Sequence, residues 1–294
     1  MIPPCYILLF CLLNRPAPLL FIFTQIPFQL SIDVFPVKRN FQISFVRIWA
    51  IMPHMNSIRG KSIPFKISGP QDLQEAAEDF RYLLNRGYPR KASLELVGNR
   101  YQLISEERQL LHRGVFSDAA STSRRKRKVP AGKIRDKDLA IDGYNVIITI
   151  EAGLAGGPLV LGDDGFIRDI SGLSGNFKKT QVTEEALALI FDVIKKVSPR
   201  QTLFLFDAPI SRSGELAREV RNQLRREDLP GDAKAVNVPE KILIGFPGTV
   251  ATSDTAIVDE SEKVVDLAGY IIRKRIEIKS LVRWRRKSLP ASLC

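Results

Sequence analysis

The spacing of apolar positions divides the chain beyond its first fifty residues into a helical part and a part that alternates strands and helices. Within Gln71–Arg86, apolar residues recur every three or four positions, the spacing that places them on one helix face, and Gly87 supplies a stop signal. Shorter segments of similar character follow at Lys91–Val97 and Ser105–Arg113. We therefore predict a small helical domain within residues 55–116.

A polar, basic stretch follows this domain. The Ser-, Thr- and Ala-containing segment from Ser117 runs into the basic run Arg124–Lys128 and then to Pro130 and Gly132. This composition is typical of an exposed linker, and we predict one at residues 117–136. The basic run is compatible with clamping a nucleic acid and equally with being a solvated segment.

The second part of the chain repeats short apolar runs separated by segments with helical spacing. Leu139–Ile141, Leu203–Phe206 and Val250–Thr252 are predicted strands, and Ala235–Val238 and Val264–Val265 are two more. This alternation predicts an α/β fold in which a mostly parallel sheet lies between layers of helices, a three-layer α/β/α domain over residues 137–280.

The glycine-rich stretch between the first strand and the next helix has two features. A hairpin is predicted around Asp163–Gly165, and a loop at Ser171–Gly175 leads to Lys178 and Lys179. The loop could cradle a phosphate, but it lacks both the P-loop pattern and the G-x-G-x-x-G fingerprint. Ordinary turn chemistry is therefore the favoured interpretation of its glycines.

Three predicted strands end on an aspartate. Asp142 follows the first strand, Asp207 follows the second, and Asp254 comes shortly after Val250–Thr252. One such residue is compatible with a turn, but open α/β sheets bind ligands outside the carboxyl ends of their strands. Carboxylates gathered there repel one another and need a cation. Mg²⁺ or Mn²⁺ suits such oxygen ligands and can activate water for attack on a phosphodiester.

The scarcity of histidine and cysteine narrows the possible chemistry. The two histidines, His54 and His112, are isolated in sequence, and the three cysteines are Cys5, Cys11 and Cys294. A zinc site, a disulfide framework and a Ser-His-Asp triad are therefore not expected.

The charge balance favours a polyanionic partner. The chain has 44 Lys and Arg against 32 Asp and Glu, a formal net charge of +12, so nucleic acid is the first candidate. On helices such side chains are also commonly a solvated face. The candidate nucleic-acid contacts are Lys178, Lys179, Arg212, Arg218, Arg124 and Arg125.

The two ends of the chain differ from the rest. Residues 1–54 are strongly apolar, but Asn14 and Arg15 interrupt a bilayer-length span, and no basic start or A-x-A-like exit indicates a signal peptide. We expect this segment to be an extension upstream of a native start at Met52 or Met55, and the protein to be cytoplasmic. Residues 281–294 are expected to form a basic tail.

The segments Ile141–Asn145, Phe206–Asp207 and Thr252–Asp254 resemble the PIN-like nuclease superfamily, particularly its NYN branch. The resemblance covers about residues 139–278 and implies a three-layer fold that binds Mg²⁺ or Mn²⁺ and cleaves RNA. It implies that Asp142, Asp207 and Asp254 are catalytic and metal-binding, that Asn145 and Ser253 support them, and that Asp259 is a candidate fourth metal ligand. The chain after Met55 also resembles an uncharacterised archaeal family that pairs a helical N-terminal region with this domain.

The expected function is a metal-dependent nuclease, with RNA favoured over DNA as the substrate. An aspartyl phosphatase would require an acid where Tyr144 stands, and a Rossmann oxidoreductase would require glycines after the first strand. A noncatalytic nucleic-acid-binding protein with the same fold is the main alternative, and a toxin-like or regulatory role stays open.

Overall fold

The computed structural model describes residues 30–34, 46–50, 70–170 and 177–285. Contacts divide the chain into two units, Met1–Lys61 and Ser62–Cys294. In the first unit, β1 (Leu30–Val34) and β2 (Val46–Ala50) form an antiparallel pair. The expected native start at Met52 or Met55 and the loop at 171–175 lie outside the described residues. None of the helices within the described ranges combines the length and apolar character that crossing a bilayer requires.

The predicted helical module is present at the start of the second unit. It consists of α1 (Pro70–Asn85), α2 (Arg90–Arg100) and α3 (Ser105–Gly114), which match the three expected segments closely. The buried side chains of its core also include Val160, which belongs to strand β4 (Leu159–Leu161). The helical module thus shares its core with a hairpin far along the chain.

The segment expected to be an exposed linker is instead mostly helical. Ser117 accepts a hydrogen bond from the Ala120 backbone N–H and begins α4 (Asp118–Arg127), and η1 (Ala131–Ile134) follows. The inward-facing residues of α4 are Ser121 and Arg124, which are buried although polar. A pattern of apolar residues could not reveal this helix, because ionic contacts bury its inner face.

The predicted parallel sheet is confirmed. Its five strands are all parallel and lie in the order β7 (Gly231–Val236), β6 (Gln201–Asp207), β3 (Asp138–Asp142), β8 (Thr249–Ala251) and β9 (Val264–Val265). Strand β7 corresponds to the strand predicted at 235–238, but it begins and ends earlier in the sequence than predicted.

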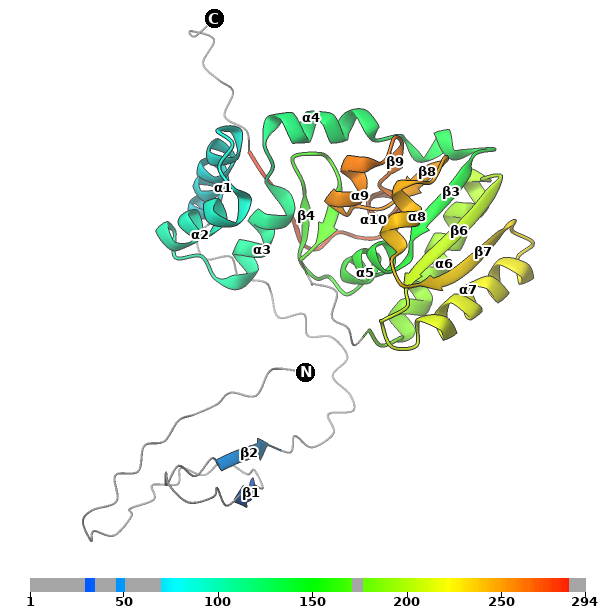
Figure 1. The fold of residues 1–294 in the computed structure, drawn as a ribbon, viewed down its shortest axis with the longest axis horizontal. Helices are drawn as coiled ribbons and strands as arrows, with labels where there is room; N and C mark the ends of the chain where they lie inside the picture. The colour runs from blue at the N-terminus through cyan, green and yellow to red at the C-terminus, as the bar shows by residue number, and fades with distance from the viewer. Residues whose placement is uncertain (1–29, 35–45, 51–69, 171–176, 286–294) are drawn as a thin grey trace, which may run out of the picture. The chain divides into compact units, whose positions relative to one another are not determined.

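Helices cover both faces of this sheet, which confirms the three-layer arrangement (Figure 1). Leu139 and Ile141 point to one face, and Ala140 between them points to the other, as the period of two in a strand requires. The first face packs against α5 (Gly143–Leu154), α6 (Gln181–Val197), α7 (Ser213–Arg226) and α10 (Leu267–Arg275). The second packs against α8 (Pro239–Ile244) and α9 (Thr255–Glu260).

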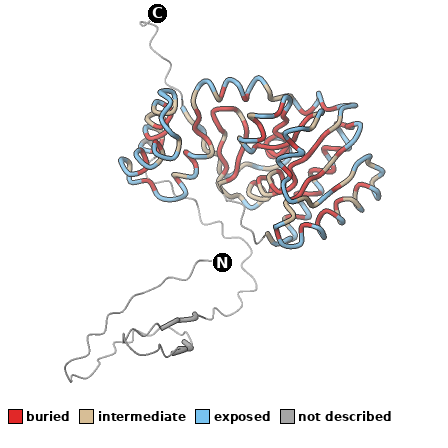
Figure 2. Tube along the Cα trace, in the orientation of Figure 1, coloured by how far each residue is buried: buried red, intermediate tan, exposed pale blue. Residues whose placement is uncertain are grey.

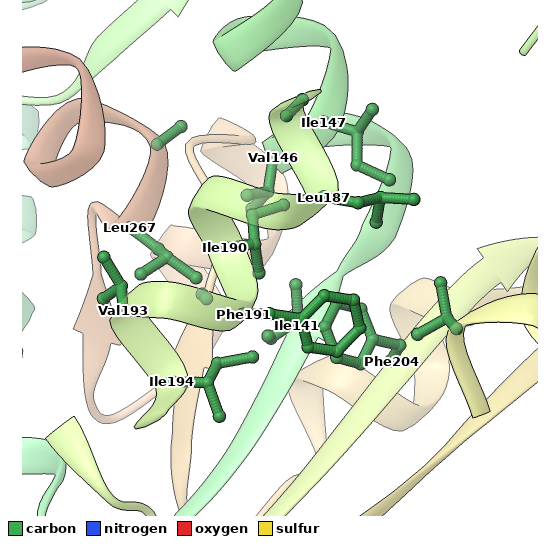
Figure 3. Packing of buried hydrophobic residues seen from close by; sticks show 14 of the residues in the cluster. Ile141, Val146, Ile147, Leu187, Ile190, Phe191, Val193, Ile194, Phe204 and Leu267 are labelled. Carbon is green, nitrogen blue, oxygen red and sulfur yellow. The ribbon is translucent and has the colours of Figure 1, made fainter. Parts of the chain in front are cut away.

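The largest core lies on the first face, and Figure 3 shows α6 at its centre. Phe191 of α6 lies 6.0 Å, centroid to centroid, from Phe204 of β6. The sides of the helices that face the sheet are buried and their outer sides exposed, as Figure 2 shows.

A second, smaller sheet has the order β10 (Leu281–Arg283), β4 (Leu159–Leu161) and β5 (Ile167–Asp169). The antiparallel pair β4 and β5 is the hairpin predicted around Asp163–Gly165. Strand β10 pairs in parallel with β4, so the beginning of the expected basic tail is an ordered strand. Residues 286–294 lie outside the described residues.

The strand order places a topological switch point beside β3. From β3 the chain adds β6 and β7 on one side and then returns to place β8 and β9 on the other. In open α/β sheets, the crevice outside the carboxyl ends of the two strands at such a point is the usual ligand site. Here those strands are β3 and β8, which Asp142 ends and Asp254 follows.

Gly143 is required where β3 turns directly into α5. A Cβ atom at this position would lie 2.3 Å from Phe206 Cε1 and 2.9 Å from the Leu205 carbonyl oxygen. We expect Gly143→Ala to lower the free energy of unfolding by about 1–3 kcal/mol, since overpacking forces neighbours apart. Urea denaturation followed by circular dichroism measures this.

Gly214→Ala is the matched control, because nothing lies within 4 Å of a Cβ at that helical glycine. It should leave the stability unchanged or raise it slightly. Equal effects of the two substitutions would show that close packing at Gly143 is not what excludes a side chain.

Candidate acidic site

A pocket of about 200 Å³ lies at the carboxyl ends of the central strands. Five of the residues that line it are acidic, including all three aspartates expected at strand ends. Its lining is Arg113, Asp142, Tyr144, Asn145, Ile148, Asp169, Asp207, Glu240, Asp254 and Ile257. The fold thus brings Asp142, Asp207 and Asp254 together around one cavity.

Asp142 is the most deeply placed of these three acids, and 8% of its surface is exposed. Thr252 Oγ1 donates a hydrogen bond of 2.8 Å to Asp142 Oδ2. The pKa of the Asp142 carboxyl is raised to about 7, mainly by burial and in smaller part by the charges of Asp254 and Asp207, whereas the Thr252 hydrogen bond lowers it. A nearby cation would relieve this unfavourable burial of charge.

Asn145 connects the start of α5 to the segment that follows β8. Its Oδ1 accepts hydrogen bonds from the Ser253 backbone N–H at 2.8 Å and from Ser253 Oγ at 3.0 Å. The Asp254 backbone N–H in turn donates to Thr252 Oγ1 at 3.1 Å. These contacts fix the segment that carries Asp254 relative to Asp142.

Asp207 and Tyr144 form the part of the pocket beside β6. Burial and then the charge of Glu240 raise the pKa of Asp207. The Tyr144 ring packs edge-on against Phe177 and Phe206, with centroid distances of 4.9 and 5.3 Å. Burial, followed by the charge of Asp207, raises the pKa of Tyr144 to about 12, so its hydroxyl is protonated at neutral pH.

Asp254 is exposed and also has a structural role. It is the N-cap of α9, where Oδ1 accepts hydrogen bonds from the Ala256 N–H at 2.9 Å and the Ile257 N–H at 3.3 Å. The other carboxylate oxygen has no such cap bond, so capping and ligand binding are compatible.

The pocket also contains acids that the sequence analysis missed. Asp169, 3% exposed, ends β5 and accepts a 3.0 Å hydrogen bond from Thr149 Oγ1 through Oδ2, whereas Oδ1 has no hydrogen-bond partner among the described residues. It ends the short run Phe166-Ile167-Arg168, so a strand followed by an aspartate was a signal that could have identified it, although the charged Arg168 interrupts the apolar run. Glu240, in the first turn of α8, has no comparable sequence signal.

Asp259, the candidate fourth ligand, does not line the pocket. Its carboxylate instead receives two hydrogen bonds of 2.7 Å from the Arg124 guanidinium. Arg124 is 7% exposed and also pairs with Asp164 at 3.3 Å. The structure therefore uses both residues to attach α4 to the rest of the fold, and it places neither Asp259 among the pocket acids nor Arg124 on the surface.

The other predicted nucleic-acid contacts are at the surface. Lys178, Arg212 and Arg218 are exposed, as are Lys179 and Arg125. Lys179 is paired with Glu219 at 2.6 Å and with Glu184 at 3.1 Å, and Arg125 donates to the Asp163 carbonyl. Of these five exposed residues, Lys179 and Arg125 thus have intramolecular partners.

The chemistry of the donors fits Mg²⁺ or Mn²⁺ better than zinc. Within the described ranges, no three Asp, Glu, His or Cys side chains are close enough to hold one ion. Mg²⁺, however, keeps several waters and uses only one or two carboxylates together with substrate phosphates. Asp169 Oδ1, which has no hydrogen-bond partner among the described residues, and the buried Asp142 carboxylate are oxygen donors that Mg²⁺ or Mn²⁺ can use.

Comparison with known proteins identifies relatives of both parts. A family model described as a protein of unknown function (DUF434) matches residues 72–127, and one described as a domain of unknown function (DUF5616) matches residues 131–270. No solved structure matches the chain. The uncharacterized protein MJ0935 of Methanocaldococcus jannaschii is 32% identical over 202 residues, which are 68% of this chain and 96% of that protein. The chain therefore belongs to the family of this archaeal protein.

Proposed function

We propose that this protein is a metal-dependent nuclease that hydrolyses phosphodiester bonds, with RNA as the favoured substrate and Mg²⁺ or Mn²⁺ as the cofactor. The observation that carries the proposal is the acidic pocket at the switch point of a parallel sheet. Five carboxylates line it, and one buried carboxylate oxygen, Asp169 Oδ1, has no hydrogen-bond partner among the described residues. Such a site attracts cations.

Asp142, Asp207 and Asp254 are the candidate metal ligands, and Asp169 is a further donor. Since no three acids of the described residues lie close enough to hold one ion together, one or two of them would bind the metal together with water and substrate oxygens. When bound, the metal would activate a water molecule and stabilise the negative charge that develops on the phosphate. Thr252 orients the Asp142 carboxylate, and Asn145 with Ser253 holds the segment that carries Asp254. The chain thus positions its acids before any ligand binds.

The net charge of +12 supports a nucleic acid as the partner. The acidic pocket itself repels a phosphate backbone, so exposed cations such as Lys178, Arg212 and Arg218 would supply the sequence-independent attraction. Binding should therefore weaken as the salt concentration rises. The preference for RNA follows from the resemblance to the NYN branch.

The test is cleavage of labelled single-stranded and structured RNA and DNA by the full chain in Mg²⁺, Mn²⁺ or EDTA. We expect cleavage that requires metal and that Asp142→Asn and Asp207→Asn each reduce at least about 100-fold, in line with other losses of transition-state stabilisation. Asp192→Asn removes an exposed acid of α6 outside the pocket and should cleave normally.

Binding of nucleic acid without cleavage in either metal would contradict the nuclease. That outcome would instead support a noncatalytic nucleic-acid-binding protein. Cleavage that persists in Asp142→Asn at the wild-type rate would place the activity outside this pocket or in a contaminant.

A further inference from the structure

Three polar groups of the acidic pocket lack a hydrogen-bond or salt-bridge partner among the described residues: the Tyr144 hydroxyl, Asp169 Oδ1 and the Arg113 guanidinium. Tyr144 is 1% exposed and Asp169 is 3% exposed, yet the Tyr144 hydroxyl and Asp169 Oδ1 have no hydrogen-bond partner among the described residues. Arg113 is half-buried and forms no salt bridge within those same ranges. Buried polar groups without partners are unfavourable unless a ligand or water satisfies them.

Arg113 is contributed by the helical module, not by the α/β domain. It lies in the last turn of α3, and the structure fixes this turn against the β4–β5 hairpin. The Gly114 carbonyl accepts a 2.8 Å hydrogen bond from the Asp163 N–H. Gly114 also approaches Val160 so closely that a Cβ would lie 2.4 Å from Val160 Cγ2. The backbone that carries Arg113 is therefore held in place beside the pocket.

The charges around Arg113 distinguish it from an ordinary surface arginine. Of the described residues that line the pocket, five are acidic and Arg113 is the one with a cationic side chain. An anionic ligand could approach such a surface only with cations beside it. A guanidinium presents a planar set of donors that matches phosphate oxygens, and a tyrosine hydroxyl can donate one further hydrogen bond.

We propose that the Arg113 guanidinium and the Tyr144 hydroxyl are the donors that bind a substrate phosphate in the acidic pocket. The helical module then supplies part of the substrate-binding site, and the α/β domain alone is incomplete. This inference rests on the proposed function, since it assumes that the pocket receives a phosphate together with a divalent cation.

The test compares two ligands that differ only in a phosphate. Adenosine 5′-monophosphate and adenosine are titrated into the full chain in Mn²⁺ by isothermal titration calorimetry. Wild-type protein should bind the monophosphate more tightly. Arg113→Gln and Tyr144→Phe should each raise its Kd at least tenfold and leave adenosine unaffected, whereas Arg113→Lys, which retains the charge without the planar donors, should have an intermediate effect.

Matched controls come from the same module. Arg86→Gln and Tyr82→Phe change an exposed arginine and an exposed tyrosine outside the pocket and should not change the Kd. Tyr144→Phe removes no intramolecular hydrogen bond of the described residues, so its melting temperature should not fall. This variant tests the proposal even if Arg113→Gln is unstable.

The outcomes separate this inference from the nuclease. Wild-type Kd values for the monophosphate in both variants, or no preference of the wild type for it, would overturn the inference while nucleic-acid cleavage could still be intact. Phosphate binding that depends on Arg113 and Tyr144, in a protein that cleaves nothing in Mg²⁺ or Mn²⁺, would support the inference and overturn the nuclease.

Discussion

Arg168→Ala is expected to lower the free energy of unfolding by about 3–5 kcal/mol, the usual effect of removing one partner from a buried ion pair. Arg168 is 2% exposed and Asp164 is fully buried. The guanidinium donates to both Asp164 carboxylate oxygens, at 2.9 and 2.8 Å, and to the Ser253 carbonyl at 2.7 Å. Without Arg168, the one salt bridge of Asp164 that remains among the described residues is the 3.3 Å pairing with Arg124.

The same substitution should disturb the acidic pocket, because Ser253 lies next to Asp254. Chemical denaturation measures the stability, and metal binding at a temperature where the variant is folded measures the site. Arg275→Ala is the control: its pair with Asp192, at 3.6 Å, is exposed and should contribute little. If Arg168→Ala lowers the free energy of unfolding by no more than Arg275→Ala does, the buried network does not stabilise the fold.

Asp142→Asn should make the metal-free protein more stable at pH 8, although we expect it to abolish activity. The folded-state pKa of Asp142 is about 7, well above the ordinary value of about 3.9. As pH rises from about 4 to 7, the unfolded chain loses this proton before the folded protein does, so stability falls. Since one pKa unit corresponds to about 1.4 kcal/mol, asparagine should relieve a penalty of up to roughly 4 kcal/mol above pH 7.

The measurement is thermal or urea denaturation of both proteins in EDTA from pH 4 to pH 8. The difference in free energy of unfolding between Asp142→Asn and the wild type should be small near pH 4 and largest above pH 7. Asp254→Asn is the control, because Asp254 is exposed and asparagine is also a good N-cap, so a small change is expected. A variant that is less stable than the wild type at pH 8 would show that burial of this charge is not the dominant cost.

If the pocket holds the metal, addition of Mn²⁺ at pH 8 should make the wild-type protein more stable than Asp142→Asn, the reverse of their order in EDTA. A ligand that binds only the folded state raises its stability, so wild-type protein should gain at pH 8. Asp142→Asn should gain much less, since it lacks one charged oxygen donor. This contrast links the stability of the fold to the proposed chemistry of the pocket.

Several elements of this fold were predictable because local chemistry decides them. The helix predicted at 71–86 is α1, the apolar run Leu203–Phe206 is the centre of β6, and the hairpin around Asp163–Gly165 joins β4 and β5. Periodicity succeeds at these places because apolar side chains form the buried faces. It failed for α4, whose buried Ser121 and Arg124 are polar.

The same distinction holds for the pocket. Strand-then-aspartate patterns identified Asp142, Asp207 and Asp254, because parallel strands end at one edge of a sheet. They did not identify Arg113 or Glu240, which reach the pocket from helices whose positions depend on tertiary packing. Asp259 is close in sequence to Asp254, but this proximity was misleading, because its carboxylate pairs with Arg124, far away in the sequence, and lies outside the pocket.

The sequence by itself determined the alternation of strands and helices, the basic charge, the oxygen-rich donor set and three acids of the pocket. These properties follow from residue type and short-range spacing. Only the tertiary structure decided the strand order, the burial of Asp142 and the joining of the helical module to the hairpin. Those features depend on contacts between residues far apart in the chain, such as Arg168 with Ser253, whose free energies no local pattern records.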